Sequence, residues 1–292
     1  MATRGRRQDN VHCGLSVPNF GESSYARTLV ELAAIAEGSG WDGFFLWDHI
    51  SMSSRMRKPF PMVDSFTALA AIAANTKRIH IGTAVTPLAR RRPWVLARQS
   101  ASLDHLSGGR LILGVGLGNP PDAEFERFGE SSDSKIRAEK LDEGLDILVG
   151  LWSGKAFSYQ GRHYQIQETV FLPPPKQLPR IPIWVGGFWP NKSPFLRAAR
   201  WDGVIPAKMG SSVTPKDLRD ILAIIKNQRT SKAPFDAAII HRGTKTSNAK
   251  KIQPYVEAGL TWWLESMYRW CNSPRDMRAH IRKGPPRISD RA

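Results

Sequence analysis

The stretch RIHIGTAVTPLARRRPWVLARQSASLDHLSGGRLILGVGLG, residues Arg78–Gly118, decides the fold. It begins with a short apolar strand, Ile79–Ala84, and a helix then starts at Pro93, a favoured first helical position. The helix stops before Ser107-Gly108-Gly109, a sharp turn that leads into a second apolar strand, Arg110–Val115. Short apolar strands joined by a helix are typical of a parallel sheet.

The same alternation of strand and helix extends along the chain on both sides of this stretch. Further strands are expected at Val11–Val17, Gly43–Trp47, Ile181–Val185, Gly203–Pro206, Asp236–Ile240 and Leu260–Glu265. Helices are expected at Ser23–Ser39, after a cap at Asp64, around Leu141–Trp152, and near Asn191–Arg200, Pro215–Gln228, Ser247–Ala258 and Pro274–Arg282. Eight strand–helix units in 292 residues predict an α/β fold, the closed (β/α)8 TIM barrel. A doubly wound open sheet fits the same pattern.

One segment, Lys155–Leu178, interrupts the alternation. Its Tyr159-Gln160-Gly161 region predicts a small hairpin, and Pro173-Pro174-Pro175 predicts an extended connector. We therefore expect a hairpin insertion between strands 4 and 5 of the barrel. No linker divides the chain, so residues 11–292 are expected to form a single domain after a flexible polar leader at residues 1–10.

The chain is strongly basic, because 42 Lys and Arg against 26 Asp and Glu give a formal charge of +16. Such a charge suits nucleic acid, an acidic membrane or an anionic small molecule as a partner. The two cysteines, Cys13 and Cys271, exclude a disulfide framework and a Cys-rich metal site. No apolar run reaches the ~18 residues of a membrane span, and no apolar core of a secretory signal follows the first arginines. We expect a cytoplasmic protein without a membrane partner.

Chemistry in a barrel of this kind takes place at the carboxyl ends of the strands. That rule selects a set of candidates before any motif is considered: Asn19, Asp48, His49, Thr86, Gly116, Gly118, Asn119, Gly186, Gly187, Lys208, His241, Arg242 and Glu265. The Asp48-His49 pair joins a carboxylate to an imidazole that titrates near neutrality and passes protons. An isolated pair of this kind is more often structural, for example as a turn cap. The seven histidines show no metal-ligand spacing, so no metal is expected.

Two glycine motifs each have a functional and a structural interpretation. Gly114-Val115-Gly116-Leu117-Gly118 fails the dinucleotide pattern, since Asn119 stands where a third glycine is needed. Its glycines let either a flat ring or a neighbouring backbone come close to the strand. Gly186-Gly187 is expected either to open a helix, where free amides bind phosphate, or to form an ordinary tight turn. In Thr261–Glu265, strand alternation predicts one tryptophan facing the helices and the next facing the barrel axis.

Taken together, these residues resemble the luciferase-like monooxygenases, (β/α)8 oxidoreductases that use FMN or the deazaflavin coenzyme F420, and most of all their short F420-dependent members. The similar segments are collinear over nearly the whole chain: GLSVPNFG at Gly14–Gly21, GWDGFFLWDH at Gly40–His49, the stretch at Arg78–Gly118, PPPKQLPRIPIWVGG at Pro173–Gly187, RAARWDGVIP at Arg197–Pro206 and YVEAGLTWWLES at Tyr255–Ser266. The long block from the third to the fourth strand is specific to this family.

The resemblance implies roles for particular residues. Asp48 would contact the cofactor and His49 would transfer a proton, while a non-prolyl cis peptide at Ala84-Val85 would form a bulge behind the ring. The further implied cofactor-binding residues are Thr86 beside the bulge, Gly116, Gly118 and Asn119 around the ring, Gly186 and Gly187 at the phosphate, and Lys208. Some F420-dependent sugar-phosphate dehydrogenases have a catalytic glutamate directly after the strand-4 glycines. Asn119 occupies that position here, and an amide does not replace a carboxylic acid as proton donor.

The sequence thus predicts a flavin- or F420-dependent oxidoreductase that exchanges a hydride with, or oxygenates, a small organic substrate. F420 is slightly favoured over FMN because basic residues expected around the barrel mouth would attract its carboxylate tail: Arg55, Arg57, Lys58, Arg90, Arg91, Arg92, Lys192, Lys208, Arg242 and Lys245. The alternative is a non-catalytic barrel that carries a cofactor or binds nucleic acid. No nucleic-acid-binding module is visible, so nucleic acid is not an expected partner. The family often dimerises, and a homodimer is one expectation.

Overall fold

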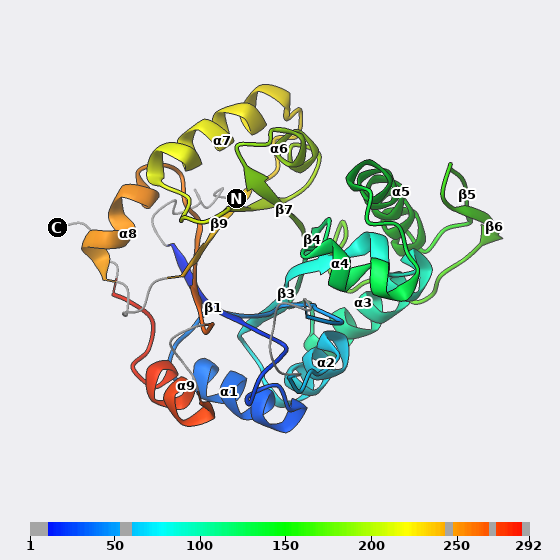
Figure 1. The fold of residues 1–292 in the computed structure, drawn as a ribbon. Coiled ribbons are helices and arrows are strands. Elements are labelled where there is room, and N and C mark those ends of the chain that lie inside the picture. The colour runs from blue at the N-terminus through cyan, green and yellow to red at the C-terminus, as the bar shows by residue number, and fades with distance from the viewer. Residues whose placement is uncertain (1–10, 53–59, 243–247, 269–272, 288–292) are drawn as a thin grey trace, which may run out of the picture.

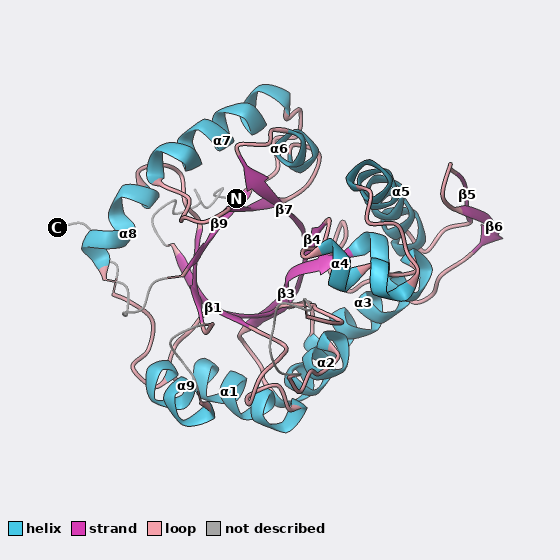
Figure 2. Cartoon of the chain, viewed as in Figure 1, coloured by secondary structure: helices cyan, strands magenta, loops and turns pink. Residues whose placement is uncertain are grey.

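The computed structural model describes residues 11–52, 60–242, 248–268 and 273–287. Within them, eight parallel strands close into a barrel in the order β1-β10-β9-β8-β7-β4-β3-β2, as seen end-on in Figures 1 and 2. The barrel strands are β1 (His12–Val17), β2 (Gly43–Leu46), β3 (His80–Pro87), β4 (Leu111–Gly116), β7 (Ile183–Trp189), β8 (Gly203–Lys208), β9 (Asp236–His241) and β10 (Trp262–Ser266). The predicted TIM barrel is confirmed, and the open sheet is excluded.

Helices surround the strands as the predicted alternation requires (Figure 2). They are α1 (Ala26–Gly38), α2 (Ser65–Asn75), α3 (Pro93–Ser107), α5 (Ser134–Trp152), α6 (Ser193–Ala198), α7 (Pro215–Gln228), α8 (Ala249–Val256) and α9 (Pro274–Ile281), with the short α4 (Pro121–Glu124), η1 (Leu88–Arg90) and η2 (Glu126–Phe128) after β3 and β4. Local chemistry fixes their ends. The Asp64 carboxylate accepts a hydrogen bond from the Thr67 amide at the start of α2, and Gly108 ends α3 at a φ of 74°.

The segment between α5 and β7 forms the expected hairpin, β5 (Phe157–Gln160) paired antiparallel with β6 (Gln165–Thr169). The hairpin lies outside the barrel, beyond α5, in Figure 1. It is attached to α5 through Glu143, whose carboxylate accepts hydrogen bonds from the backbone amides of Arg162 and Tyr164 at 2.9 and 3.0 Å. The insertion therefore extends the outer layer and contributes no strand to the barrel.

Two adjacent tryptophans on β10 show how the strands divide the core. The Trp262 ring lies inside the barrel, 5.6 Å from the ring of Phe45 and 5.4 Å from that of Trp184. The Trp263 ring faces the helical layer, where it contacts Tyr255 on α8 with ring centroids 5.3 Å apart. The predicted alternation is confirmed, and residue parity along a strand identifies which side chains point into the barrel.

Two strands run further toward the barrel mouth than the sequence predicted. β3 continues to Pro87 through a register shift between Thr83 and Thr86, and the Ala84-Val85 peptide bond is cis, as the resemblance implied. β7 continues to Trp189, so Gly186-Gly187 does not open a helix, and α6 begins only at Ser193. The expected phosphate-binding helix start at this pair is wrong, because both glycines are paired with β8.

No helix in the part of the chain that the structure describes is long and apolar enough to cross a membrane.

Candidate active site

Asp48, directly after β2, is buried beneath two arginines. The Arg91 guanidinium donates to both of its carboxylate oxygens, at 2.9 and 2.6 Å, and Arg90 donates to its backbone oxygen at 2.7 Å. Burial acts to lower the pKa of Arg91, but the carboxylates of Asp48 and Asp64 outweigh it and raise this pKa above its ordinary value. The Asp48 side chain is only 2% exposed, and both of its carboxylate oxygens are bound by Arg91. We therefore describe Asp48 as a positioning residue.

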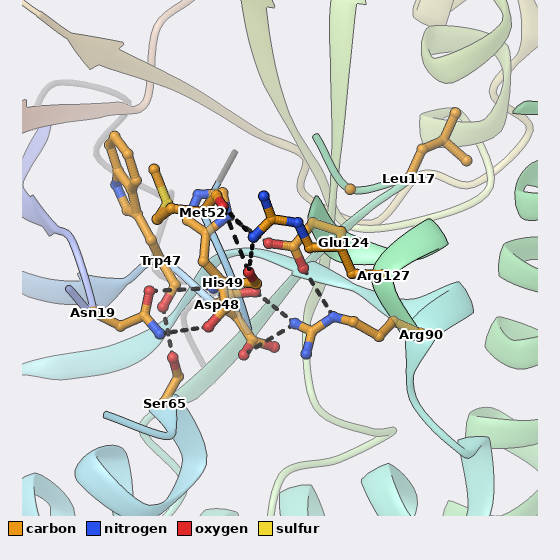
Figure 3. A network of polar contacts seen from close by, with 12 residues as sticks. Asn19, Trp47, Asp48, His49, Met52, Ser65, Arg90, Leu117, Glu124 and Arg127 are labelled. Atoms are coloured by element: carbon orange, nitrogen blue, oxygen red, sulfur yellow. Dashed lines mark hydrogen bonds and ion pairs between the residues drawn. The ribbon is translucent and has the colours of Figure 1, made fainter. Parts of the chain in front are cut away.

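His49, the next residue, contacts a carboxylate that sequence reasoning missed. Its Nδ1 lies 2.7 Å from Oε1 of Glu124 on α4, and the other carboxylate oxygen lies 3.0 Å from Nε of Arg90. Arg90 therefore lies between Asp48 and Glu124, as Figure 3 shows. A carboxylate accepts from Nδ1–H, which leaves the Nε2 lone pair as the proton acceptor. Among the described residues, none forms a hydrogen bond with Nε2.

The backbone of His49 is fixed by Asn19, which follows β1 and is fully buried. Its side-chain amide donates to the His49 carbonyl oxygen at 2.8 Å, and its side-chain oxygen accepts from the His49 amide at 3.1 Å (Figure 3). Trp47 is held in the same way, since its indole donates to Ser16 Oγ at 2.8 Å. The imidazole is thus oriented from its backbone and from its ring, which is the preorganisation that proton transfer needs.

Glu124 is placed by the loop that follows β4. Arg137 on α5 donates to the carbonyl oxygens of Leu117 and Gly118 at 2.9 and 2.8 Å, and its guanidinium lies over the Phe125 ring. A Cβ on Gly118 would lie 2.8 Å from that ring, so only glycine, at a φ of +83°, lets α4 pack here. Asn119, at the position of the expected family glutamate, is exposed. A carboxylate is instead supplied by Glu124, the last residue of the short helix α4 that follows β4. The strand-end rule would have selected Glu124 if it had been extended through that helix.

The β3 bulge builds the next part of the site. Val85 is half-buried, and a Cβ on Gly116 or Gly186 would lie 2.8 or 3.0 Å from its side chain. A Cβ on Gly114 would lie 2.1 Å from the Thr83 carbonyl oxygen, so that glycine serves the close approach of a backbone. Thr86 is fully buried, and its Oγ1 has no hydrogen-bond partner in the described chain. An apolar shelf beside an unpaired hydroxyl fits a flat heteroaromatic ring such as a flavin or deazaflavin.

Three titratable residues at the ends of β8, β9 and β10 are bound to the helical layer. Lys208 Nζ lies 3.0 Å from the Asp217 carboxylate on α7. His241 Nε2 lies 3.0 Å from Lys251 Nζ on α8. The Glu265 carboxylate lies 2.7 Å from His280 Nε2 on α9. Burial, together with the Lys251 ammonium, lowers the pKa of His241 to about 4. This imidazole is therefore neutral near pH 7.

Two of the basic residues expected around the barrel mouth, Arg90 and Arg91, are largely buried and paired with acidic side chains. Their side chains are 8% and 15% exposed. Arg92 lies against Trp94, with its guanidinium 5.7 Å from the ring centroid. Of the other residues in that expectation, Lys192 and Arg242 are exposed and Lys208 is paired with Asp217. Arg55, Arg57, Lys58 and Lys245 lie outside the described residues, as do the leader at 1–10 and Cys271. No group of three or more His, Cys, Asp or Glu side chains that could hold a metal ion occurs among the described residues.

Comparison with known proteins gives a consistent family. An F420-dependent glucose-6-phosphate dehydrogenase of Microbacterium testaceum is 32% identical over 163 residues, 56% of this chain and 47% of that enzyme. The oxygenase component of a flavin-dependent trigonelline monooxygenase of Acinetobacter baylyi is 30% identical over 167 residues, 57% of this chain and 44% of that protein. The chain thus matches about half the length of these two relatives.

The same fold occurs in a solved F420-dependent secondary alcohol dehydrogenase bound to an F420–acetone adduct. The two chains superpose with a TM-score of 0.76 at 16% identity, over 96% of this chain and 99% of that one. The sequence model of the luciferase-like monooxygenases matches residues 11–261, nearly the whole barrel. The chain therefore belongs to the luciferase-like monooxygenase family.

Proposed function

We propose that this protein is an oxidoreductase that uses F420 or FMN and that His49, supported by Glu124, exchanges a proton with the substrate. The observation that carries the proposal is the 2.7 Å contact between His49 Nδ1 and the fully buried Glu124 carboxylate at the barrel mouth. A histidine oriented in this way is a general acid–base, and family membership supplies the redox class.

The residues that would hold the cofactor ring are Val85, Thr86 and the glycines behind the bulge, Gly116 and Gly186. F420 or FMN, when bound, supplies hydride transfer, which no side chain of the protein performs. We favour F420, because several curated relatives similar to this chain are F420-dependent dehydrogenases. The buried arginines give F420 no advantage over FMN, so this preference does not depend on the positive charge.

The protein's own part is to accept and return a proton at His49 Nε2. When Nε2 takes up a proton, the Glu124 carboxylate stabilises the resulting imidazolium, since both ring nitrogens then donate hydrogen bonds. Arg90 in turn holds Glu124 in place by direct contact, with its Nε 3.0 Å from the second carboxylate oxygen. This arrangement replaces the acid that the family pattern would place at Asn119.

Titration of the purified protein with F420 and with FMN, followed by fluorescence quenching, tests the cofactor. We expect a micromolar or tighter Kd for one of them, and failure of both to bind would overturn the proposal. His49→Ala should keep that Kd within a factor of three, because the imidazole is placed toward the substrate and the ring rests on other residues.

The non-catalytic alternative is tested by the same preparation. A carrier protein would bind cofactor and show no turnover with any member of a panel of alcohols, ketones and aromatic compounds. A nucleic-acid-binding barrel would retain DNA or RNA on a filter with an affinity that falls steeply as salt rises. We expect turnover, and no such retention.

A further inference from the structure

We infer that Arg90 is a positioning residue that holds His49 at two points and thereby selects the imidazole tautomer in which Nδ1 carries the proton. This inference rests on the proposed function for the use of that imidazole in proton exchange. It is carried by the contacts of one guanidinium, which reach both the backbone that carries His49 and the carboxylate that contacts its ring (Figure 3).

The first contact fixes the peptide that leads into His49. Arg90 Nη2 donates to the carbonyl oxygen of Asp48 at 2.7 Å, and this oxygen belongs to the planar peptide unit between Asp48 and His49. The same nitrogen lies 3.5 Å from Asp48 Oδ1. The guanidinium is therefore anchored just after β2, one residue before the imidazole.

The second contact is made by a different nitrogen of the same group. Arg90 Nε and Glu124 Oε2 lie 3.0 Å apart as an ion pair, and neither atom forms a hydrogen bond to any other described group. Both atoms are buried, so solvent does not replace the contact if it is lost. The other oxygen of this carboxylate, Oε1, lies 2.7 Å from His49 Nδ1. Arg90 thus fixes which oxygen Glu124 turns toward the ring.

Arg91, the next residue in the chain, does not share this task. Its guanidinium donates to both carboxylate oxygens of Asp48 and lies 3.5 Å from Asp64 Oδ2. Among the described residues, the ion pairs of Glu124 are those with His49 and Arg90. Because the Glu124 side chain is fully buried, its orientation depends on these two partners.

The tautomer of His49 follows from the direction in which the hydrogen bonds run. An ionised carboxylate only accepts hydrogen bonds, so His49 Nδ1 donates to Glu124 Oε1 and keeps its proton. The neutral ring then presents an unprotonated Nε2. If Glu124 turned away, the ring proton would be free to occupy either nitrogen. The ion pair that holds Oε1 against Nδ1 therefore decides which nitrogen accepts a proton.

Only arginine places a donor at both of these positions. Its Nε lies within the side chain and its Nη2 at the end, whereas lysine has a methylene in place of Nε and a single terminal ammonium. The substitution Arg90→Lys keeps the positive charge and most of the aliphatic stem, but it leaves Glu124 Oε2 facing a methylene. This variant therefore separates the positioning role from the mere presence of a cation.

The test is nitrogen NMR of the imidazole rings in the full chain, labelled with ¹⁵N-histidine and recorded without added cofactor from pH 6 to pH 9. The signals of His49 are those missing from the spectrum of His49→Gln. We expect a protonated Nδ1 and an unprotonated Nε2 wherever the ring is neutral. A ring protonated at Nε2, an equal mixture of the two tautomers, or a ring that is charged at every pH would overturn the inference.

Arg90→Lys should raise the ratio of the Nε2–H to the Nδ1–H tautomer about tenfold, which is the effect of losing one charge-assisted contact. If this variant does not fold, Arg90→Gln, which removes the charge and the contact with the Asp48 carbonyl oxygen, should change the ratio in the same direction. An unchanged ratio would contradict the positioning role.

The matched control is Arg197→Lys in the helical layer. Arg197 Nε and Nη2 bind the two carboxylate oxygens of Asp142 at 2.5 and 2.8 Å, and its side chain is 10% exposed against 8% for Arg90. The control should leave the tautomer of His49 unchanged, and an equal change in both variants would overturn the inference. Because no cofactor is added, this outcome is independent of the titration that tests the proposed function.

Discussion

The two halves of the barrel mouth use charge in opposite ways. After β2, β3 and β4, acidic and basic side chains meet one another over the barrel, in the network of Asp48, His49, Arg90, Arg91 and Glu124. Figure 3 shows Asp48, His49, Arg90 and Glu124 of this network. At the ends of β8, β9 and β10, Lys208, His241 and Glu265 are bound outward to the following helix. The difference teaches that charged side chains of the first half bind one another over the mouth, while those named in the second half are held by the helical layer.

Removal of the imidazole should give the largest effect, since it deletes the group that transfers the proton. His49→Ala is expected to lower kcat about 10²- to 10⁴-fold with an identified substrate. Glu124→Gln should lower kcat by a smaller factor and shift the pH–rate profile, because the imidazolium loses its ionic partner. Steady-state kinetics across pH check both, and full turnover of His49→Ala would remove the acid–base role.

A buried arginine removed from the same half should destabilise the fold. Arg91→Met leaves the Asp48 carboxylate, 2% exposed, without its bidentate partner, and loss of one member of a buried pair costs about 3–5 kcal/mol. Urea unfolding measures the change in the free energy of unfolding. A loss below about 1 kcal/mol would show that the Arg91–Asp48 pair contributes no more to the free energy of unfolding than a partly exposed ion pair does.

The His241 imidazole should make stability depend on pH in the other half. Its pKa is lowered from 6.5 to about 4, by burial first and by Lys251 second, against an opposing effect of Glu265. The stabilisation is therefore complete above pH 6.5 and is lost as pH falls toward 4, where the unfolded chain binds a proton that the native state does not. The expected loss is about 2 kcal/mol after allowance for solvent screening.

Urea midpoints measured between pH 7 and pH 4 check this dependence. His241→Gln removes the titrating group, so its midpoint should fall less over that interval than that of the unchanged protein. Parallel curves for the two proteins would assign the pH dependence to other groups.

The smallest effect is expected at Lys208. Its side chain is 31% exposed, and a partly exposed ion pair contributes about 0.2–1 kcal/mol, so Lys208→Met should lower the free energy of unfolding by no more than that. The same substitution of a cation by methionine thus compares the two halves directly. A tenfold rise in the Kd for F420 would instead make Lys208 a cofactor ligand, as the sequence predicted, and would break the comparison.

What the sequence predicted well was local or periodic. The β10 alternation placed Trp262 and Trp263 on opposite sides of the strand, and the strand-end rule selected His49. Glu124 was missed because its contact with His49 joins residues 75 positions apart, and its helix has only four residues. The pairing of Arg90 and Arg91 was missed for the same reason, since their acidic partners Asp48 and Glu124 are distant in the chain.

The strand boundaries failed where the backbone is unusual. Glycines normally signal a turn, and Gly186-Gly187 was assigned to one. Both lie inside β7, paired with β8. They are glycines because Val85 and Pro194 occupy the space their side chains would fill, 3.0 and 2.2 Å from the respective Cβ positions. Only the tertiary neighbours, which no local pattern contains, distinguish these two outcomes.

The tight contact between β3 and β4 has a consequence for protein engineering. A methyl group on Gly114 would meet the Thr83 carbonyl oxygen, and one on Gly82 would meet that of Ile112 at 2.0 Å, so neither position tolerates a larger residue without moving a strand. The inward positions of β8 and β9 nearest the mouth, Ala207 and Ile240, already carry side chains and are only half-buried. A mutant library confined to those two positions would change which molecule is accepted while the machinery around His49 stays intact.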